Sequence, residues 1–333
     1  MVTLKDIAEA LNVSIPQVSK VLNHSHSTVG VSAETARRIR QAAEAMGYVR
    51  NRTAAALRTG RHNTIGVLIQ PWGAVGSGLT EALLTGIAEE TALRDQHIEL
   101  RFYRGQDEFH RALARINGAA IDGLIVAGVR NSECADALER VVADGLPVVT
   151  VHIEAVGTLP NMQCNEREVG RLATEHLIEQ GCTSIAHIRF TPRRYEGYVD
   201  ALRNAGLPLR EALVYGTPHR LEVNVENGQR ATERFLACGV AFDGIVAESD
   251  FFAMGAMVKL IQEGLCVPDD VKIIGVDDSP ICLCGPVPLS SVSLDVPARA
   301  RLAVRKLLDA VAGEAVQSIT CTPALVVRRS SGG

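Results

Sequence analysis

The chain has 333 residues, of which 47% are hydrophobic and 4% aromatic, and its formal net charge is −4. This length predicts about two domains plus a small module, with a core packed mainly from Ala, Val, Leu and Ile. No run approaches the roughly 18 apolar residues that span a bilayer, and the first residues lack the pattern of a secretory signal. We therefore expect a cytoplasmic protein with no membrane-embedded part.

The charge is distributed unevenly along the chain. Residues 1–61 hold nine Lys and Arg against four Asp and Glu, a net charge of +5, and the remainder holds 25 against 34, a net charge of −9. A basic segment on an acidic body is typical of a protein that binds the phosphate backbone of nucleic acid. A generic solvated surface can carry the same charge. The helical pattern of the segment is therefore needed to distinguish a nucleic-acid-binding head from such a surface.

The eight cysteines do not form a metal-binding or disulfide pattern. No C-x-x-C pair occurs; Cys282 and Cys284 are the closest two, and His24 and His26 stand apart from them in the sequence. A tetrahedral metal site needs two such pairs. We expect reduced thiols, no metal and no cofactor.

The first fifty residues predict three short helices. Thr3 is a suitable N-cap for the first helix and Ser14 for the second, where Pro16 is tolerated in the first turn. The two apolar faces consist of Ile7, Ala8 and Leu11, and of Val18, Val21 and Leu22. A helix, a tight turn and a second helix of this size is the helix-turn-helix arrangement, whose second helix enters the DNA major groove.

A third helix is predicted at 33–46 after Ser32, followed by a basic, Ala-rich segment at 51–58 that Asn51 can cap. This segment has too little apolar surface to fold alone. We expect it to form a helix against its twin from a second chain in a DNA minor groove, with Leu57 as an apolar wedge between base steps. An ordinary flexible linker is the alternative.

The motif V-T-[LI]-x-D-[VI]-A…V-S…V-S-[RK]-V-[LV]-N, then V-S-x-x-T and G-Y-x-x-N-x-x-A-x-x-L, is met almost in full from Val2 to Leu57. The head resembles that of the LacI/GalR family of transcription regulators, in which the fourth segment is a hinge helix that orders on operator DNA. The resemblance places base-reading positions at Ile15, Pro16 and Lys20. It places phosphate contacts at Ser14, Gln17, Ser19, Asn23 and Asn51, and minor-groove contacts at Ala54 and Leu57. Pro16 and Lys20 depart from the usual residues, which leaves the operator sequence open.

From Asn63 onward, strand-like apolar runs alternate with amphipathic helices. Strands are predicted at 64–69, 97–103, 122–127, 147–151, 185–188, 212–215, 244–247 and 271–276. Helices are predicted at 79–93, 108–116, 134–144, 168–180, 196–205, 227–237 and 253–263. This alternation predicts parallel sheets covered on both faces, in two similar α/β lobes, with ligands at the carboxyl ends of the strands.

An α/β body can also belong to an enzyme, but the catalytic motifs are missing. There is no G-x-x-x-x-G-K-[ST], no G-x-S-x-G and no H-E-x-x-H, and Glu81 stands where the third glycine of a dinucleotide fingerprint would be. We expect no catalysis.

The body also resembles the LacI/GalR family, in blocks at 168–177, 247–256, 267–278, 288–292 and 325–330. The resemblance implies two periplasmic-binding-protein-like lobes with parallel sheets, joined by three crossings near residues 180, 290 and 320. The implied domains are a helix-turn-helix domain at 1–48, a hinge at 49–61 and an effector-binding and dimerisation domain at 62–333. Its lobes would span about 62–180 with 291–319, and about 181–290 with 320–330.

The family's effector-contacting positions carry over one at a time. They fall on Asp277, Arg194, Asn165, Ser249 and Thr80, with Trp72 as an alternative stacking face for the aromatic residues missing near Thr80. Asp277 can instead be a structural carboxylate, and Trp72 a packing residue. An arginine such as Arg194 suits a carboxylate or a hydroxyl-rich ligand.

These features predict a repressor that binds operator DNA as a homodimer, under the control of a small effector bound between the lobes. A tetramer, and either inducer or corepressor behaviour, remain open. The effector class implied by the resemblance is a sugar, sugar acid, sugar phosphate or nucleobase. Two alternatives are a solute-binding transport protein, which the head disfavours, and an α/β enzyme with a DNA-binding appendage.

Overall fold

The computed structural model describes residues 2–23, 31–48, 60–71, 76–118, 120–129, 132–217 and 221–333. Its internal contacts divide the chain into two compact units, Met1–His62 and Asn63–Gly333. The predicted hinge positions Asn51, Ala54 and Leu57 and the tryptophan Trp72 lie outside the described residues.

The head contains three helices, each opened by a local cap. They are α1 (Leu4–Leu11), α2 (Ile15–Asn23) and α3 (Ala33–Ala45). Thr3 and Asp6 form a reciprocal capping box on α1, and Ser32 caps α3 by accepting from the amide of Thr35 at 3.1 Å. Each cap satisfies backbone N–H groups that have no partner inside the helix. The predicted helix starts are thus confirmed at residue level.

A small apolar core joins the three helices of the head. It consists of Ile7, Ala8, Val18, Val21, Ala36, Ile39 and Ala43, all buried. These residues recur at helical spacing, so each helix turns one apolar face inward. The predicted Leu11 and Leu22 are only partly buried at its edge.

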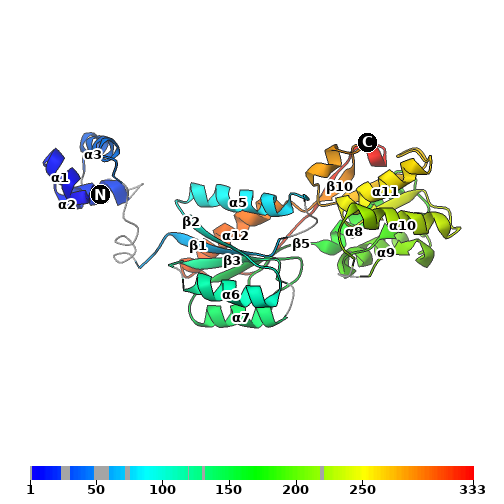
Figure 1. The fold of residues 1–333 in the computed structure, drawn as a ribbon, viewed down its shortest axis with the longest axis horizontal. Helices are drawn as coiled ribbons and strands as arrows, with labels where there is room; N and C mark the ends of the chain where they lie inside the picture. The colour runs from blue at the N-terminus through cyan, green and yellow to red at the C-terminus, as the bar shows by residue number, and fades with distance from the viewer. Residues whose placement is uncertain are drawn as a thin grey trace. The chain divides into compact units, whose positions relative to one another are not determined.

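The body begins with a four-stranded parallel sheet in the order β2-β1-β3-β4. The strands are β1 (Thr64–Ile69), β2 (His97–Phe102), β3 (Gly123–Ala127) and β4 (Val148–Val151). Helices α5 (Leu79–Leu93) and α12 (Val296–Val311) cover one face, and α6 (Gln106–Asn117) and α7 (Ser132–Ala143) the other (Figure 1). We call this part the first lobe.

The second lobe is built on a six-stranded sheet in the order β12-β10-β9-β8-β6-β7, in which only β12 runs antiparallel. Its strands are β6 (Ile185–Ile188), β7 (Val214–Tyr215), β8 (Gly244–Ala247), β9 (Lys272–Val276), β10 (Ser290–Ser293) and β12 (Ala324–Val326). Its α-helices are α8 (Glu166–Glu179), α9 (Pro192–Asn204), α10 (Val225–Ala237) and α11 (Asp250–Gln262). Short 3-10 turns occur at Glu211–Leu213, Pro280–Leu283 and Arg329–Ser331.

Two short parallel strands, β5 (Met162–Cys164) and β11 (Ile319–Cys321), pair with each other where the chain passes between the lobes (Figure 1). The third passage runs from β10 into α12. The predicted elements ended at residue 276, so α12 and the strands after β9 are additions from the structure. The signals of α12 were present, since Asp295 caps it and Pro297 occupies its first turn.

Helix α8 packs against α9 of the second lobe, whereas the family resemblance implied a crossing near residue 180, after this helix. A Cβ atom on Gly170 would lie 1.9 Å from the carbonyl oxygen of Arg194, and one on Gly197 would lie 2.0 Å from that of Arg167. Glycine at both positions lets the two helix backbones approach closely. The first crossing therefore precedes α8, directly after β5.

Candidate functional site

The first turn of α2 presents the predicted base-reading side chains at the surface. Ile15 is 46% exposed, an unusual value for an isoleucine next to a packed core, and Pro16 is also exposed. Lys20 lies on the next turn and is partly exposed. Exposed apolar groups beside a cation suit a major groove, where thymine methyl groups and guanine acceptors lie side by side.

A second capping box fixes the start of α2. The amide and hydroxyl of Ser14 both donate to Gln17 Oε1 at 3.1 Å, and the amide of Gln17 donates back to Ser14 Oγ at 3.4 Å. The side-chain nitrogen of Gln17 takes no part in this box and is the group that a DNA phosphate would accept from. Ser19 is partly exposed, and Asn23 ends the helix with its side chain outside the described residues.

In the body, the predicted effector-contacting residues follow the carboxyl ends of strands. Asp277 directly follows β9, Ser249 follows β8, Arg194 lies in the first turn of α9 after β6, and Asn165 directly follows β5. The carboxyl ends of β6, β8 and β9 meet at one edge of the second sheet, because these strands are parallel. The structure thus brings Asp277, Ser249 and Arg194 to neighbouring positions. Asn165 adjoins them because the next residue, Glu166, is ion-paired with Arg194.

Arg194 lies at this edge, and its guanidinium group forms a buried ion pair with Glu166. Its Nε donates to Glu166 Oε2 at 2.5 Å and its Nη1 to the backbone oxygen of Glu248 at 2.7 Å. Arg194 and Glu166 are 4% and 3% exposed. Burial lowers the pKa of the guanidinium, but the carboxylates of Glu166, Asp277 and Glu248 outweigh it, so the net shift is upward. We call Glu166, Arg194, Glu248 and Asp277 the carboxyl-edge cluster.

The carboxylate of Glu248 is saturated with donors. Its Oε1 lies 2.8 Å from Nε2 of His187, and its Oε2 accepts from the backbone amides of Phe190 and Thr191 and from the Thr191 hydroxyl. These contacts tie the end of β8 to the loop that precedes α9. Glu248 therefore supports the position of Arg194 rather than offering an acceptor to a ligand.

Unlike the carboxylate of Glu248, the carboxylate of Asp277 accepts no hydrogen bond from the described residues. Its backbone adopts a φ of 113°, a region that side chains other than glycine rarely occupy. Burial raises the pKa of its carboxyl well above the ordinary value, against the opposing influence of Arg194. Strained backbone and an unsatisfied acid are features that concentrate at binding sites.

Three other predicted effector residues have local roles. Asn165 caps α8 by accepting from the amide of Glu168 at 3.2 Å, and Ser249 caps α11 by accepting from the amide of Phe251 at 3.3 Å. Thr80 lies in the first turn of α5 in the first lobe. Their roles toward a ligand stay predictions.

Glu166, Glu248 and Arg299 were not predicted as site residues from the sequence. Arg299, on α12, is 1% exposed, donates to the backbone oxygens of Met162 and His152, and interacts electrostatically with Glu166. A glutamate in the first turn of a helix is ordinarily explained by the helix dipole, so Glu166 gave no signal of its own. Its position directly after a strand end was the available clue.

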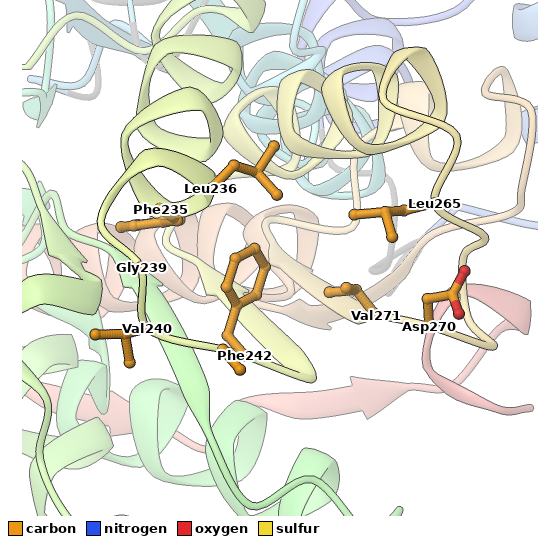
Figure 2. Close-up of a pocket in the computed structure, with 9 residues that line it drawn as sticks. Phe235, Leu236, Gly239, Val240, Phe242, Leu265, Asp270 and Val271 are labelled. Atoms are coloured by element: carbon orange, nitrogen blue, oxygen red, sulfur yellow. The ribbon is translucent and has the colours of Figure 1, made fainter.

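A cavity of about 330 Å³ lies away from this edge (Figure 2). Phe242 and Val271 in its lining precede β8 and β9, so it lies at the amino ends of the strands. Its walls are largely apolar, and Asp270 in its lining already accepts from the amide of Cys266 at 2.7 Å. A second hollow of about 560 Å³ lies beyond the ends of β1 and β2, lined by Pro71, Phe102, Tyr103, Arg104 and Glu108.

The described part of the chain contains neither a metal-binding cluster nor a membrane-spanning helix. No group of three or more His, Cys, Asp or Glu there is arranged to hold a metal ion. None of its helices is long and apolar enough to cross a membrane.

Comparison with known proteins decides the class. Residues 3–51 match the bacterial regulatory proteins of the lacI family, and residues 174–331 match the periplasmic binding protein-like domain. The regulator MalR of Streptomyces coelicolor is 31% identical over 98% of this chain and 96% of its own length. This chain belongs to the lacI family of transcriptional regulators. AglR of Rhizobium meliloti, named as a transcriptional regulator, is 29% identical over 99% of this chain and 94% of its own length.

Solved structures agree with this membership along the whole chain. The complex of the regulator CelR with cellobiose is 25% identical, with a TM-score of 0.71, covering 99% of this chain and 100% of that one. A lac repressor dimer bound to operator and an anti-inducer has a TM-score of 0.77 over 99% of both chains at 23% identity. At that identity the second comparison establishes the fold, which confirms the predicted head and the two-lobed body. The relatives are named as regulators rather than enzymes.

Proposed function

We propose that this lacI-family regulator is a repressor whose operator affinity is set by a small effector bound at the carboxyl edge of the second sheet. The observation that carries the proposal is the pairing of two sites in one chain. The head presents Ile15, Pro16 and Lys20 at its surface. The body holds Asp277 beside Arg194 with a strained backbone, and none of the described residues donates a hydrogen bond to its carboxylate. One site suits DNA and the other suits a polar ligand.

The proposed mechanism couples the two sites through the crossings between the lobes. Ligand contact with Asp277 in the second lobe favours one arrangement of the lobes, and crossing segments are natural hinges. The lobes then set the spacing of two hinge segments in a homodimer, with Ala54 and Leu57 reaching the minor groove and Asn51 a phosphate. We assign the head to residues 1–48 and the hinge to 49–61, and place the protein in the cytoplasm with its DNA.

The partners follow from this mechanism. A homodimer of two heads reads a pseudo-palindromic operator, because the symmetry of the protein is mirrored in the DNA. The body takes a sugar-like metabolite, as in the CelR complex with cellobiose. Asn165, Ser249 and Thr80 complete the ligand contacts that we assign, with Trp72 as a candidate stacking face.

Selection of binding sites from random duplex DNA with the full chain tests the proposal. We expect enrichment of one two-fold symmetric sequence, and release of that DNA by at least one compound from a panel of sugars, sugar acids, sugar phosphates and nucleobases. Binding without sequence enrichment, or an enriched site that no compound affects, would contradict it.

A further inference from the structure

The paired strands β5 and β11 bring two cysteines together from distant parts of the chain. Their parallel register places Cys321 directly opposite Cys164. One position earlier, the side-chain amide of Gln163 donates to the hydroxyl of Thr320 at 3.0 Å, across 157 residues of sequence. This bond supports the register from the opposite face of the two strands, because successive side chains alternate between faces. The two cysteine side chains therefore lie on one face, side by side.

The spacing of the two paired strands suits a disulfide. Neighbouring strands lie about 4.8 Å apart, and Cα atoms joined by a disulfide lie about 4.4–6.8 Å apart. The amide of Asn165 donates to the backbone oxygen of Cys321 at 3.1 Å, so the strands stay hydrogen-bonded at the cysteines themselves. Both thiols are free in the structure. A bond between them therefore requires no large movement of the backbone.

The two thiols share one cation and differ in their access to solvent. Arg299 of α12 is buried and interacts electrostatically with both Cys164 and Cys321. Cys164 is 3% exposed, whereas Cys321 is partly exposed and follows the exposed Thr320. A dissolved oxidant can therefore reach Cys321 first, and Cys164 is the buried partner that completes the bond.

Burial keeps both thiols protonated near neutral pH. It raises the pKa of Cys164 to about 11, and Glu166 adds to this rise while Arg299 opposes it. Burial also raises the pKa of Cys321, again against the effect of Arg299. Because the thiolate is the reactive form of cysteine, the pair stays reduced in a reducing environment. It forms a disulfide only under a strong oxidative challenge.

We propose that Cys164 and Cys321 form a reversible disulfide that joins two of the three crossings between the lobes. Hydrogen peroxide is the oxidant: one of its oxygen atoms is transferred to Sγ of Cys321, giving a sulfenic acid, and the other leaves as water. Sγ of Cys164 then displaces the transferred oxygen as a second water, and the Sγ–Sγ bond forms. The two thiols together lose two electrons and two protons, and the peroxide is reduced to two waters.

The disulfide acts on the hinge between the lobes. Strand β5 leads from the first lobe into α8, and β11 leads from α12 into β12. Crossing segments are the parts that change conformation when lobes reorient, so a bond between them restricts that movement. A disulfide between residues far apart in the sequence also restricts the unfolded chain and thereby stabilises the folded one. Neither effect depends on the identity of the effector or the operator.

Peptide mapping of the full chain tests the site. The protein is treated with hydrogen peroxide, alkylated without reduction and digested, and the peptides are identified by mass spectrometry. We expect a linked peptide that contains Cys164 and Cys321 and disappears after treatment with dithiothreitol. The oxidised protein should unfold at a midpoint at least about 2 °C above that of the reduced protein. Hydrogen exchange of the Asn165 amide, which pairs the two strands, should slow at least about fivefold.

Two variants separate this pair from the other thiols. Cys321→Ser removes one sulfur atom at a partly exposed position, so it should fold and should lose both the linked peptide and the rise in midpoint. The control is the double variant Cys266→Ser with Cys284→Ser, which removes two exposed thiols. It should retain the linked peptide and the rise in midpoint.

Two results would overturn the proposal. One is the absence of the linked peptide in a wild-type sample in which the exposed thiols of Cys266 and Cys284 have been oxidised. The other is a linked peptide with no change in the unfolding midpoint or in the exchange of the Asn165 amide, because the bond would then not restrict the crossings. Either result leaves the proposed function intact, since operator selection and effector release do not require the disulfide.

Discussion

The head and the body present their functional side chains in opposite ways. In the head, Ile15, Pro16 and Lys20 lie within two turns of one helix and are at least partly exposed. In the body, Glu166, Arg194 and Glu248 come from distant parts of the sequence and are almost fully buried. An exposed site can change without loss of stability, whereas a buried charged site supports the fold and the function together.

The largest effect that follows from this comparison is on Arg194. Replacing Arg194 with Ala leaves Glu166 as a buried charge without a partner, which costs about 3–5 kcal/mol. Urea unfolding of the full chain measures this loss. Arg193→Ala is the matched control, because the adjacent Arg193 side chain is 63% exposed and pairs only at the surface with Glu196, and such pairs contribute less than about 1 kcal/mol. Equal losses of unfolding free energy for the two variants would show that the buried ion pair of Arg194 contributes no more to stability than a surface pair.

Replacing an exposed residue of the head should weaken DNA binding with little loss of stability. Lys20→Ala removes a predicted base contact and should weaken operator binding by about 1–3 kcal/mol, while the free energy of unfolding changes by less than about 0.5 kcal/mol. Fluorescence polarisation on the selected operator, beside urea unfolding, checks both numbers. A loss of stability as large as the loss of operator affinity would show that Lys20 supports the fold of the head and is not only an exposed binding residue.

A smaller effect comes from a charged group in the first lobe. Glu90, 2% exposed, holds Arg305 and Arg94, whose hydrogen bonds lower its pKa to about 2 against the opposing effect of burial. A lowered pKa contributes stability that is present above the unfolded value of 4.5 and is lost as pH falls toward 2. Both arginines are nearly half exposed, so solvent screening limits the contribution to about 1–2 kcal/mol.

The measurement compares wild type with Glu90→Gln. The difference in the free energy of unfolding should be greatest near neutral pH and should shrink steadily below about pH 4.5. A difference that stays constant across this range would mean that the charge of Glu90 contributes nothing.

The same contrast explains what sequence could predict. Helix starts at Thr3, Ser14 and Ser32 were predictable because a cap and its partner are three residues apart. The ion pair of Glu166 with Arg194 spans 28 residues, and no local pattern links its members. The position of α8 depended on a close approach of two helix backbones at Gly170 and Gly197, which a hydrophobic pattern does not encode. Asp277 was found only through the family resemblance.

A ligand bound at the carboxyl-edge cluster is expected to control the affinity of the head for operator DNA. The most direct test of this expectation is an effector titration of the operator complex, followed by polarisation, for wild type and Asp277→Asn. We predict that the variant binds operator with an affinity within about twofold of wild type, but needs at least about tenfold more effector for the same change in DNA binding. Superimposable effector curves for the two proteins would contradict the account.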